Sequence, residues 1–403
     1  MRYCWLGILA FLLCSCSVTT ARAQVSAADV RGLVHGNSDF GLALYQRLAV
    51  KEGNLFLSPY SVSNAFGMCY AGAKGNTAAE MKTTLRFNLA DDRLHAAFAK
   101  LIGQLNTEGK KRPFQLTVAN RLWGQKDYGF LPEFSKIGQD HYGAGLEEVD
   151  FVGATEAARL KINGWVEEKT KDKIKDLIPN GVLNDLTRLV LTNAIYFKAP
   201  WMSPFDPKQT KPGDFHLANG KTVKAPMMQS HDRGSFAAFD SFSMVQIPYE
   251  GHEQSMVVLL PKKSDGLGDL EKKLNAENLE TWMKKLSTHI VDLKMPKFKV
   301  TAEFKLNDVL KEMGMKDAFV FGKADFSGMA TREKLYITAV LHKAFVDVNE
   351  AGTEAAASTA IVVGTRSLPP PATFHADRPF VFLIRDHRTG TILFVGRVAS
   401  PGA

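Results

Sequence analysis

Residues 349–367 read Asn349-Glu350-Ala351-Gly352-Thr353-Glu354-Ala355-Ala356-Ala357-Ser358-Thr359-Ala360-Ile361-Val362-Val363-Gly364-Thr365-Arg366-Ser367. A strand-like run ends just before this stretch, and Leu368 and three prolines follow it. Its first half is small and polar, so on composition alone it could be a flexible connection without a special role.

With a period of two, the same stretch has the pattern of a strand. Thr353, Ala355, Ala357, Thr359, Ile361 and Val363 would share one face, and the residues between them the other. No proline interrupts residues 350–368, whereas residues 369–371 are all proline and would stop a strand because proline lacks a backbone donor. Small side chains at the start would let the segment slide between existing strands. The sequence therefore predicts a loop that can become a strand.

The rest of the chain predicts an α+β fold. Helical spacing covers residues 37–48, 61–73, a segment from 78, 92–105, 156–175, 276–286 and 303–313. Strand-like runs cover residues 189–197, 244–248, 255–260, 290–295, 337–348, 380–384 and 391–398. Because no linker, repeat or change of composition separates these segments, we expect one domain over residues 30–400.

The first 23 residues have the features of an export signal. Arg2 supplies a charged start, residues 6–13 an apolar run, and Ala21-Arg22-Ala23 a small-residue cleavage site. We therefore expect a secreted protein, extracellular or periplasmic. The alternative is a membrane-tethered lipoprotein acylated at Cys16, within Leu13-Cys14-Ser15-Cys16.

Composition and motifs exclude several classes of protein. The chain has 403 residues, 45% of them hydrophobic, which is enough for a large core. After cleavage at residue 23 only Cys69 of the four cysteines would remain, so we expect no internal disulfide and no metal site built on thiolates. The sequence has no Gly-x-Ser-x-Gly, His-Glu-x-x-His or phosphate-binding glycine loop, so we expect no enzyme and no cofactor.

The positive charge of the chain is modest. The formal charge of +8 falls by two, to +6, when Arg2 and Arg22 leave with the signal. Lysines cluster at residues 110–111 and alternate over residues 169–175, but acids are interleaved with the second group, as on a solvated face. We expect no nucleic-acid binding, and weak polyanion binding stays open as an alternative.

Several blocks of this sequence resemble the serpin family. Residues 350–359 resemble its hinge, and Phe374-His375-Ala376-Asp377-Arg378-Pro379-Phe380-Val381-Phe382-Leu383-Ile384 resembles its C-terminal signature. Further matches are Asn54-Leu55-Phe56-Leu57-Ser58-Pro59-Tyr60-Ser61, Gly72-Ala73-Lys74-Gly75-Asn76-Thr77, Asn193-Ala194-Ile195-Tyr196-Phe197-Lys198 and Ala324-Asp325-Phe326-Ser327-Gly328-Met329. The resemblance implies a single fold of three β-sheets and about nine helices, with residues 349–371 as an exposed reactive-centre loop.

The resemblance also implies an inhibitor that is a suicide substrate of serine proteases. The protease nucleophile would attack the carbonyl of Arg366, the Arg366-Ser367 bond would open to a covalent acyl-enzyme, and the loop would insert into the main sheet. An arginine at this position indicates trypsin-like targets, whose specificity pocket holds a carboxylate. We expect a monomer. The alternative is a non-inhibitory serpin that acts as carrier, chaperone or polyanion-binding protein.

Three groups of site residues follow from the same resemblance. The hinge comprises Glu350, Gly352, Thr353, Glu354, Ala355, Ala356, Ala357, Ser358 and Thr359. The shutter, a hydrogen-bonded cluster beneath the strands that must part, comprises Ser58, Ser61, Asn193 and His342. The breach, where the loop enters, comprises Trp201 and Lys297 together with Glu350.

Overall fold

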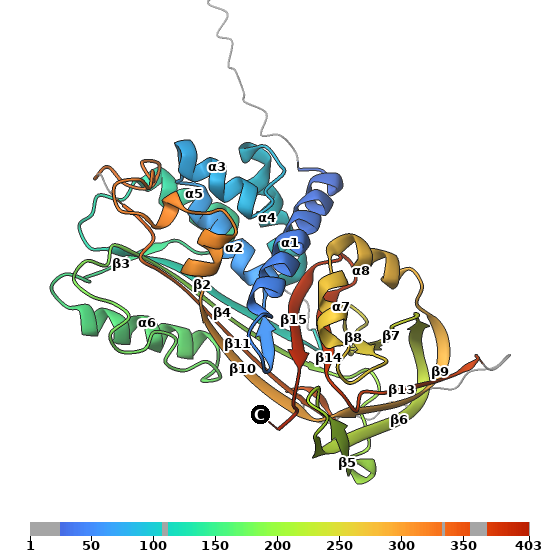
Figure 1. Cartoon of the computed structure of the whole chain (residues 1–403). Coiled ribbons are helices and arrows are strands. Elements are labelled where there is room, and N and C mark those ends of the chain that lie inside the picture. Colours follow the sequence, from blue (N-terminus) through green and yellow to red (C-terminus); the bar gives the residue numbers. More distant parts are fainter. Residues whose placement is uncertain (1–24, 107–111, 333–334, 355–368, 403) are drawn as a thin grey trace, which may run out of the picture.

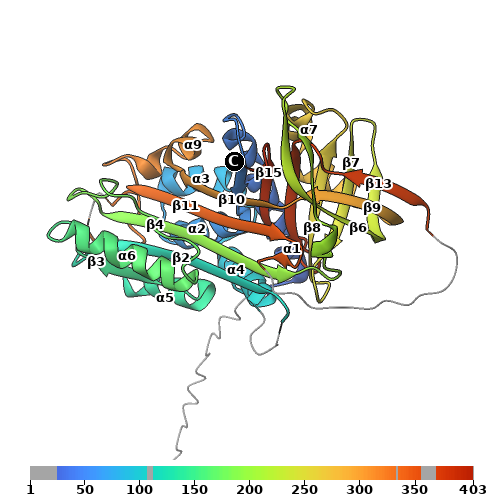
Figure 2. The same cartoon turned by 90° about the horizontal axis from the view of Figure 1, so that it is seen from below.

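The computed structural model describes residues 25–106, 112–332, 335–354 and 369–402. Within them, six strands form a sheet in the order β10-β11-β12-β4-β2-β3, shown in Figures 1 and 2. The strands are β10 (Phe298–Lys305), β11 (Ala339–Asn349), β12 (Gly352–Thr353), β4 (Leu189–Pro200), β2 (Gln115–Gln125) and β3 (Leu146–Val149). In this sheet β11 and β4 run parallel, while each pairs antiparallel with its outer neighbour, β10 or β2.

A second sheet of nine strands lies beside the first, as Figure 2 shows. Its order is β1-β15-β14-β8-β7-β6-β9-β13, and β5 pairs with β6 off this path. The strands are β1 (Leu55–Leu57), β5 (Lys211–His216), β6 (Thr222–Ala238), β7 (Phe242–Pro248), β8 (Gln254–Pro261), β9 (Ser287–Pro296), β13 (Pro371–His375), β14 (Phe380–Asp386) and β15 (Ile392–Val398).

The long strand β6 joins two parts of this second sheet. Its residues 222–227 pair with β5, residues 227–236 with β9, and only residues 235–238 with β7. The part of this sheet built around β9 and the part built around β8 are therefore joined only through β6. With the six-stranded sheet, these two parts correspond to the three sheets that the family resemblance implies.

Nine α-helices lie among the described residues. The helices α1 (Ala27–Leu48), α2 (Pro59–Tyr70), α3 (Gly75–Thr84), α4 (Asp91–Asn106), α5 (Pro132–Tyr142) and α9 (Asn307–Glu312) gather on one side of the six-stranded sheet, and α6 (Thr155–Lys169) lies on the other (Figure 1). The helices α7 (Leu267–Lys273) and α8 (Ala276–Met283) lie beside β8 and β14 (Figure 1). No helix in the described ranges is both long and apolar enough to cross a bilayer.

The six-stranded sheet is buried on both faces. Alternate residues of β4 belong to two hydrophobic clusters: Leu191 and Ile195 face α2, whereas Val190 and Ala194 face α6. Burial on both faces gives β4 a nearly continuous apolar run, which is why the sequence predicts it well.

Element boundaries differ from the sequence prediction where local signals mislead. Helix α1 begins at Ala27, ten residues before the predicted start, because Ser26 and Asp29 form a capping box. Helix α6 ends at Lys169 rather than 175, because Lys171 and Asp172 adopt left-handed backbone conformations. The predicted helix 303–313 shrinks to α9, because residues 303–305 belong to β10.

Candidate functional site

The first residues of the hinge lie between two strands of the six-stranded sheet. Strands β11 and β4 pair over residues 339–345 and 190–196, and beyond this the short strand β12 lies between them. Thr353 of β12 pairs with Val348 of β11 and with Ala199 of β4, and β12 runs antiparallel to both strands. The sheet therefore already holds the beginning of an additional strand at the place where β11 and β4 separate.

A tight turn brings the chain from β11 back into the sheet. Gly352 has a φ of +149°, and a Cβ there would lie 2.2 Å from the carbonyl oxygen of Ala199, so only glycine fits. The amides of Trp201 and Phe205 donate to the carbonyls of Ala351 and Glu350 at 3.0 and 2.9 Å. The segment after β4 thus holds the turn in place.

The predicted breach residues meet at this turn. The indole of Trp201 donates to the Asn349 carbonyl at 2.9 Å, and Lys297 lies 2.9 Å from the Glu350 carboxylate, to which Thr210 also donates. Burial acts to raise the pKa of Glu350, but the hydrogen bonds from Lys297 and Thr210 outweigh it and hold that pKa below its usual value. The structure therefore brings Trp201, Lys297 and Glu350 together.

Thr353 and Glu354 point to opposite faces of the sheet. Thr353 is fully buried, and its hydroxyl lies 2.7 Å from that of Tyr249, whose ring stacks on Trp201. Glu354 accepts a hydrogen bond of 2.6 Å from the Tyr196 hydroxyl and pairs with Lys173 at 3.2 Å. This alternation agrees with the period of two in the sequence.

The four predicted shutter residues form one buried hydrogen-bonded cluster. His342 and Asn193 hydrogen-bond across β11 and β4, and the amide of Ser58 donates to Nε2 of His342 at 3.2 Å. Asn193 donates to the Ser61 hydroxyl at 2.7 Å. Because Nε2 accepts, Nδ1 carries the proton and donates to Asn193.

The cluster joins the parting strands to the N-terminus of α2. Ser58 caps that helix, and its hydroxyl donates to the Leu393 carbonyl at 2.6 Å. Burial lowers the pKa of His342 to about 3, although the hydrogen bond with Asn193 acts to raise it, so the ring is neutral. Opening β11 from β4 would break the contact between His342 and Asn193.

Sequence reasoning missed Asn120, which completes this cluster. Its side chain accepts from Ser61 at 3.0 Å and from Asn193 at 2.6 Å, and donates to the Ser61 carbonyl. Asn120 lies opposite Asn193 on β2, a strand that the sequence analysis did not predict. A polar residue amid the strand-like run of β2 was the signal that could have revealed it.

The remaining predicted residues lie outside the described parts of the chain. They are Ala355, Ala356, Ala357, Ser358, Thr359, Arg366 and Ser367. The described chain resumes at residue 369, and β13 pairs with β9 in the second sheet. Lys110 and Lys111 also lie outside the described residues, while Lys169, Lys171 and Lys173 contact Glu168, Gln115 and Glu354.

Comparison with known proteins identifies the family. The family profile described as "Serpin (serine protease inhibitor)" matches residues 35–401. This chain therefore belongs to the serpin family, which that profile describes as protease inhibitors and not as enzymes.

Individual relatives agree over nearly the whole chain. Leukocyte elastase inhibitor A of Mus musculus is 40% identical over 379 residues, which cover 92% of this chain and 99% of the relative. Serpin B3 of Homo sapiens is 41% identical, with 92% of this chain and 100% of the relative covered. Among solved structures, maspin superposes with a TM-score of 0.86 at 30% identity, covering 93% of this chain and all of maspin. The predicted α+β serpin fold is confirmed.

The prediction of export is contradicted by these relatives. The leukocyte elastase inhibitors and serpin B3 are intracellular serpins of clade B, which lack signal peptides. The expectation of a secreted protein, extracellular or periplasmic, is therefore wrong. So is its alternative, a lipoprotein tethered to a membrane through Cys16. Those expectations came from local patterns in residues 1–23, which lie outside the described residues.

Proposed function

We propose that this serpin traps trypsin-like serine proteases by cleavage at Arg366-Ser367 and insertion of its loop into the six-stranded sheet. The observation that supports this most is the position of β12, antiparallel to both β11 and β4 at the point where they part. Insertion would extend a strand that has already begun.

The register of β12 indicates where each later loop residue would lie after insertion. Continuing its pairing would place Ala355 opposite Phe197 and Val346. Thr359 would lie opposite Asn193 and His342, at the centre of the shutter. Small side chains suit these positions, because the core beneath β4 and β11 is already packed.

Insertion would replace one parallel pairing by two antiparallel ones. Parallel pairs are slightly less stable per residue, and each new ladder hydrogen bond contributes about 0.5–1.5 kcal/mol. Ile361 and Val363 would fall on the same face as Thr353, which points into the core. These gains favour the inserted state once cleavage releases the loop.

The target class rests on Arg366. Its long cation matches the carboxylate in the specificity pocket of trypsin-like enzymes, whereas several relatives are named for leukocyte elastase.

We infer a single domain over residues 30–400, because one hydrophobic cluster includes both Val30 and Val398. Within it, residues 349–371 would be the reactive-centre loop.

Mixing the protein with trypsin tests the proposal. We expect an adduct near the sum of the two masses that survives boiling in detergent, because the acyl bond is covalent. An Arg366→Ala variant should lose the adduct with trypsin. Clean cleavage of the wild type without adduct would overturn inhibition, and an adduct with elastase but none with trypsin would overturn the target class.

A further inference from the structure

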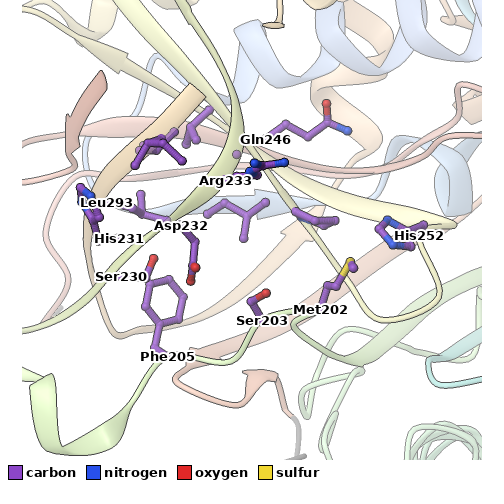
Figure 3. Close-up of a pocket in the computed structure, with 16 residues that line it drawn as sticks. Met202, Ser203, Phe205, Ser230, His231, Asp232, Arg233, Gln246, His252 and Leu293 are labelled. Atoms are coloured by element: carbon purple, nitrogen blue, oxygen red, sulfur yellow. The ribbon is translucent and has the colours of Figure 1, made fainter. Parts of the chain in front are cut away.

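A cavity opens where β6 leaves β7. The two strands pair only over residues 235–238, and towards its N-terminal end β6 diverges from β7 and stays with β9. The resulting hollow has a volume of about 650 Å³ and is closed on one side by residues 202–205, which follow β4 (Figure 3). This volume is within the range of small-molecule sites, about 300–1,000 Å³.

The deeper walls of this cavity are apolar. Val245 and Ile247 of β7, Val291 and Leu293 of β9, and Phe205 line it, and all five side chains are buried. They come from three separate segments whose positions are fixed by the sheet. The walls are therefore preformed and suited to an apolar ring or chain.

One end of the cavity carries polar donors. A second hollow shares Arg233, Gln246 and His252 with the first, and adds Thr288 and His387. Figure 3 shows Arg233 and Gln246 across the hollow from Phe205, Ser203 and Met202. The amide nitrogen of Gln246 lies 3.1 Å from the His387 ring, so this end is a continuous polar edge.

The positive charge at this end comes from Arg233. The exposed guanidinium of Arg233 has no ion-pair partner among the described residues, and Asp232 is the single acid in either described lining. Burial and the nearby Arg385 lower the pKa of His387, so that ring is neutral near pH 7. Arg233 therefore supplies the positive charge at this end, while Asp232, the preceding residue of β6, places a negative charge near Phe205 (Figure 3).

We propose that this cavity binds an amphipathic aromatic anion, whose apolar body contacts Phe205, Ile247 and Leu293 while its acidic group pairs with Arg233. A guanidinium offers paired donors to an oxyanion, and charge-assisted hydrogen bonds are the stronger ones. Ligand binding in this cavity is a different activity from cleavage of the reactive-centre loop, and the proposal does not depend on protease inhibition.

Two fluorescent probes test the proposal on the full chain: 1-anilinonaphthalene-8-sulfonate, and the uncharged N-phenyl-1-naphthylamine of nearly the same shape. We expect saturable binding of the sulfonate at one site per chain. Arg233→Met should weaken the sulfonate about tenfold, as the loss of one charge-assisted pair predicts, and leave the neutral probe unchanged. Ser203→Trp should block both probes, because Ser203 is an exposed residue at the cavity wall.

Lys262→Met is the matched control, because it removes one exposed cation at the end of β8, outside the cavity lining. It should leave both affinities unchanged. Absence of saturable sulfonate binding would overturn the proposal. So would equal affinities of the wild type and Arg233→Met for the sulfonate, or binding that Ser203→Trp does not reduce.

Discussion

Thr353 is the residue at which the proposed insertion would begin. Its side chain is 0% exposed, and its hydroxyl meets that of Tyr249 beneath the sheet. The next residue, Glu354, faces the side of the sheet that α6 covers. There its carboxylate accepts a hydrogen bond from Tyr196 and forms an ion pair with Lys173. A charge is thus accommodated at position 354 but has no partner at position 353.

Thr353→Arg should convert the inhibitor into a substrate. Burying an unpaired cation against Tyr249 costs several kcal/mol, so the loop would stay out of the sheet while trypsin completes hydrolysis. The measurement is the ratio of detergent-resistant adduct to cleaved inhibitor after mixing with trypsin.

Thr353→Ser is the control for that experiment, because it keeps the hydroxyl and reduces only size. It should form adduct nearly as well as the wild type. If Thr353→Arg traps trypsin as efficiently as the wild type, the inward orientation of the odd-numbered hinge residues is wrong for the inserted state.

At the scale of elements, the joint between β11 and β4 depends on a neutral histidine. Burial lowers the pKa of His342 to about 3 in the folded protein, whereas an unfolded chain has a value near 6.5. Between these values the unfolded state binds a proton that the folded state does not. The contribution of the neutral His342 ring to the free energy of unfolding is therefore complete above about pH 6.5 and is lost as the pH falls towards 3.

We expect the free energy of unfolding to fall by up to about 1.4 kcal/mol per pH unit through His342 in this window. Urea unfolding at pH 5, 6 and 7 would measure it. His342→Gln should flatten the slope. His95, whose pKa burial and the neighbouring His141 lower to about 4, adds a similar slope, so His95→Gln shows how much belongs to each ring.

The assignment to His342 fails if His342→Gln keeps the full slope of the wild type. Where that variant does not fold, the ring can be titrated in the wild type by NMR. A His342 signal that titrates near pH 6.5 in the folded protein would contradict the neutral ring.

At the scale of the whole molecule, cleavage of the loop should raise stability. The cleaved chain can complete the strand that β12 begins, and each kcal/mol gained in a chain of this size moves the unfolding temperature by a few degrees. We expect a rise of more than about 10 °C after limited cleavage, measured by circular dichroism.

Cleaved Thr353→Arg should unfold near the temperature of its uncleaved form, because its hinge cannot enter. The same comparison tests the mechanism independently of any protease complex. A cleaved wild type with an unchanged unfolding temperature would mean that the loop does not insert.

The sequence predicts the elements whose burial leaves a regular pattern. Strand β4 is apolar throughout because both of its faces are covered, and the period of two in the hinge is visible in residue size. The grouping of Ser58, Ser61, Asn193 and His342 came from family resemblance, since residues so distant in sequence cannot be placed together by local patterns.

Other features depend on contacts that a single sequence does not encode locally. Strands β5 and β6 have few buried residues and contain Pro212, Gly213 and Gly234, so their apolar signal is weak. Asn120 joins the predicted shutter residues only through the pairing of β2 with β4, which local sequence patterns do not reveal. The cavity arises from the divergence of β6 from β7, which is a property of pairing and not of composition.

The segment 202–205 has two neighbours that no pattern in the sequence connects. It forms a wall of the cavity, and the amide of Phe205 holds the Glu350 carbonyl at the root of the hinge. By thermodynamic linkage, an occupant of the cavity that changes the free energy of hinge insertion must itself bind with an affinity that insertion changes by the same factor. Ligand binding in the cavity and insertion of the loop would then each shift the equilibrium of the other.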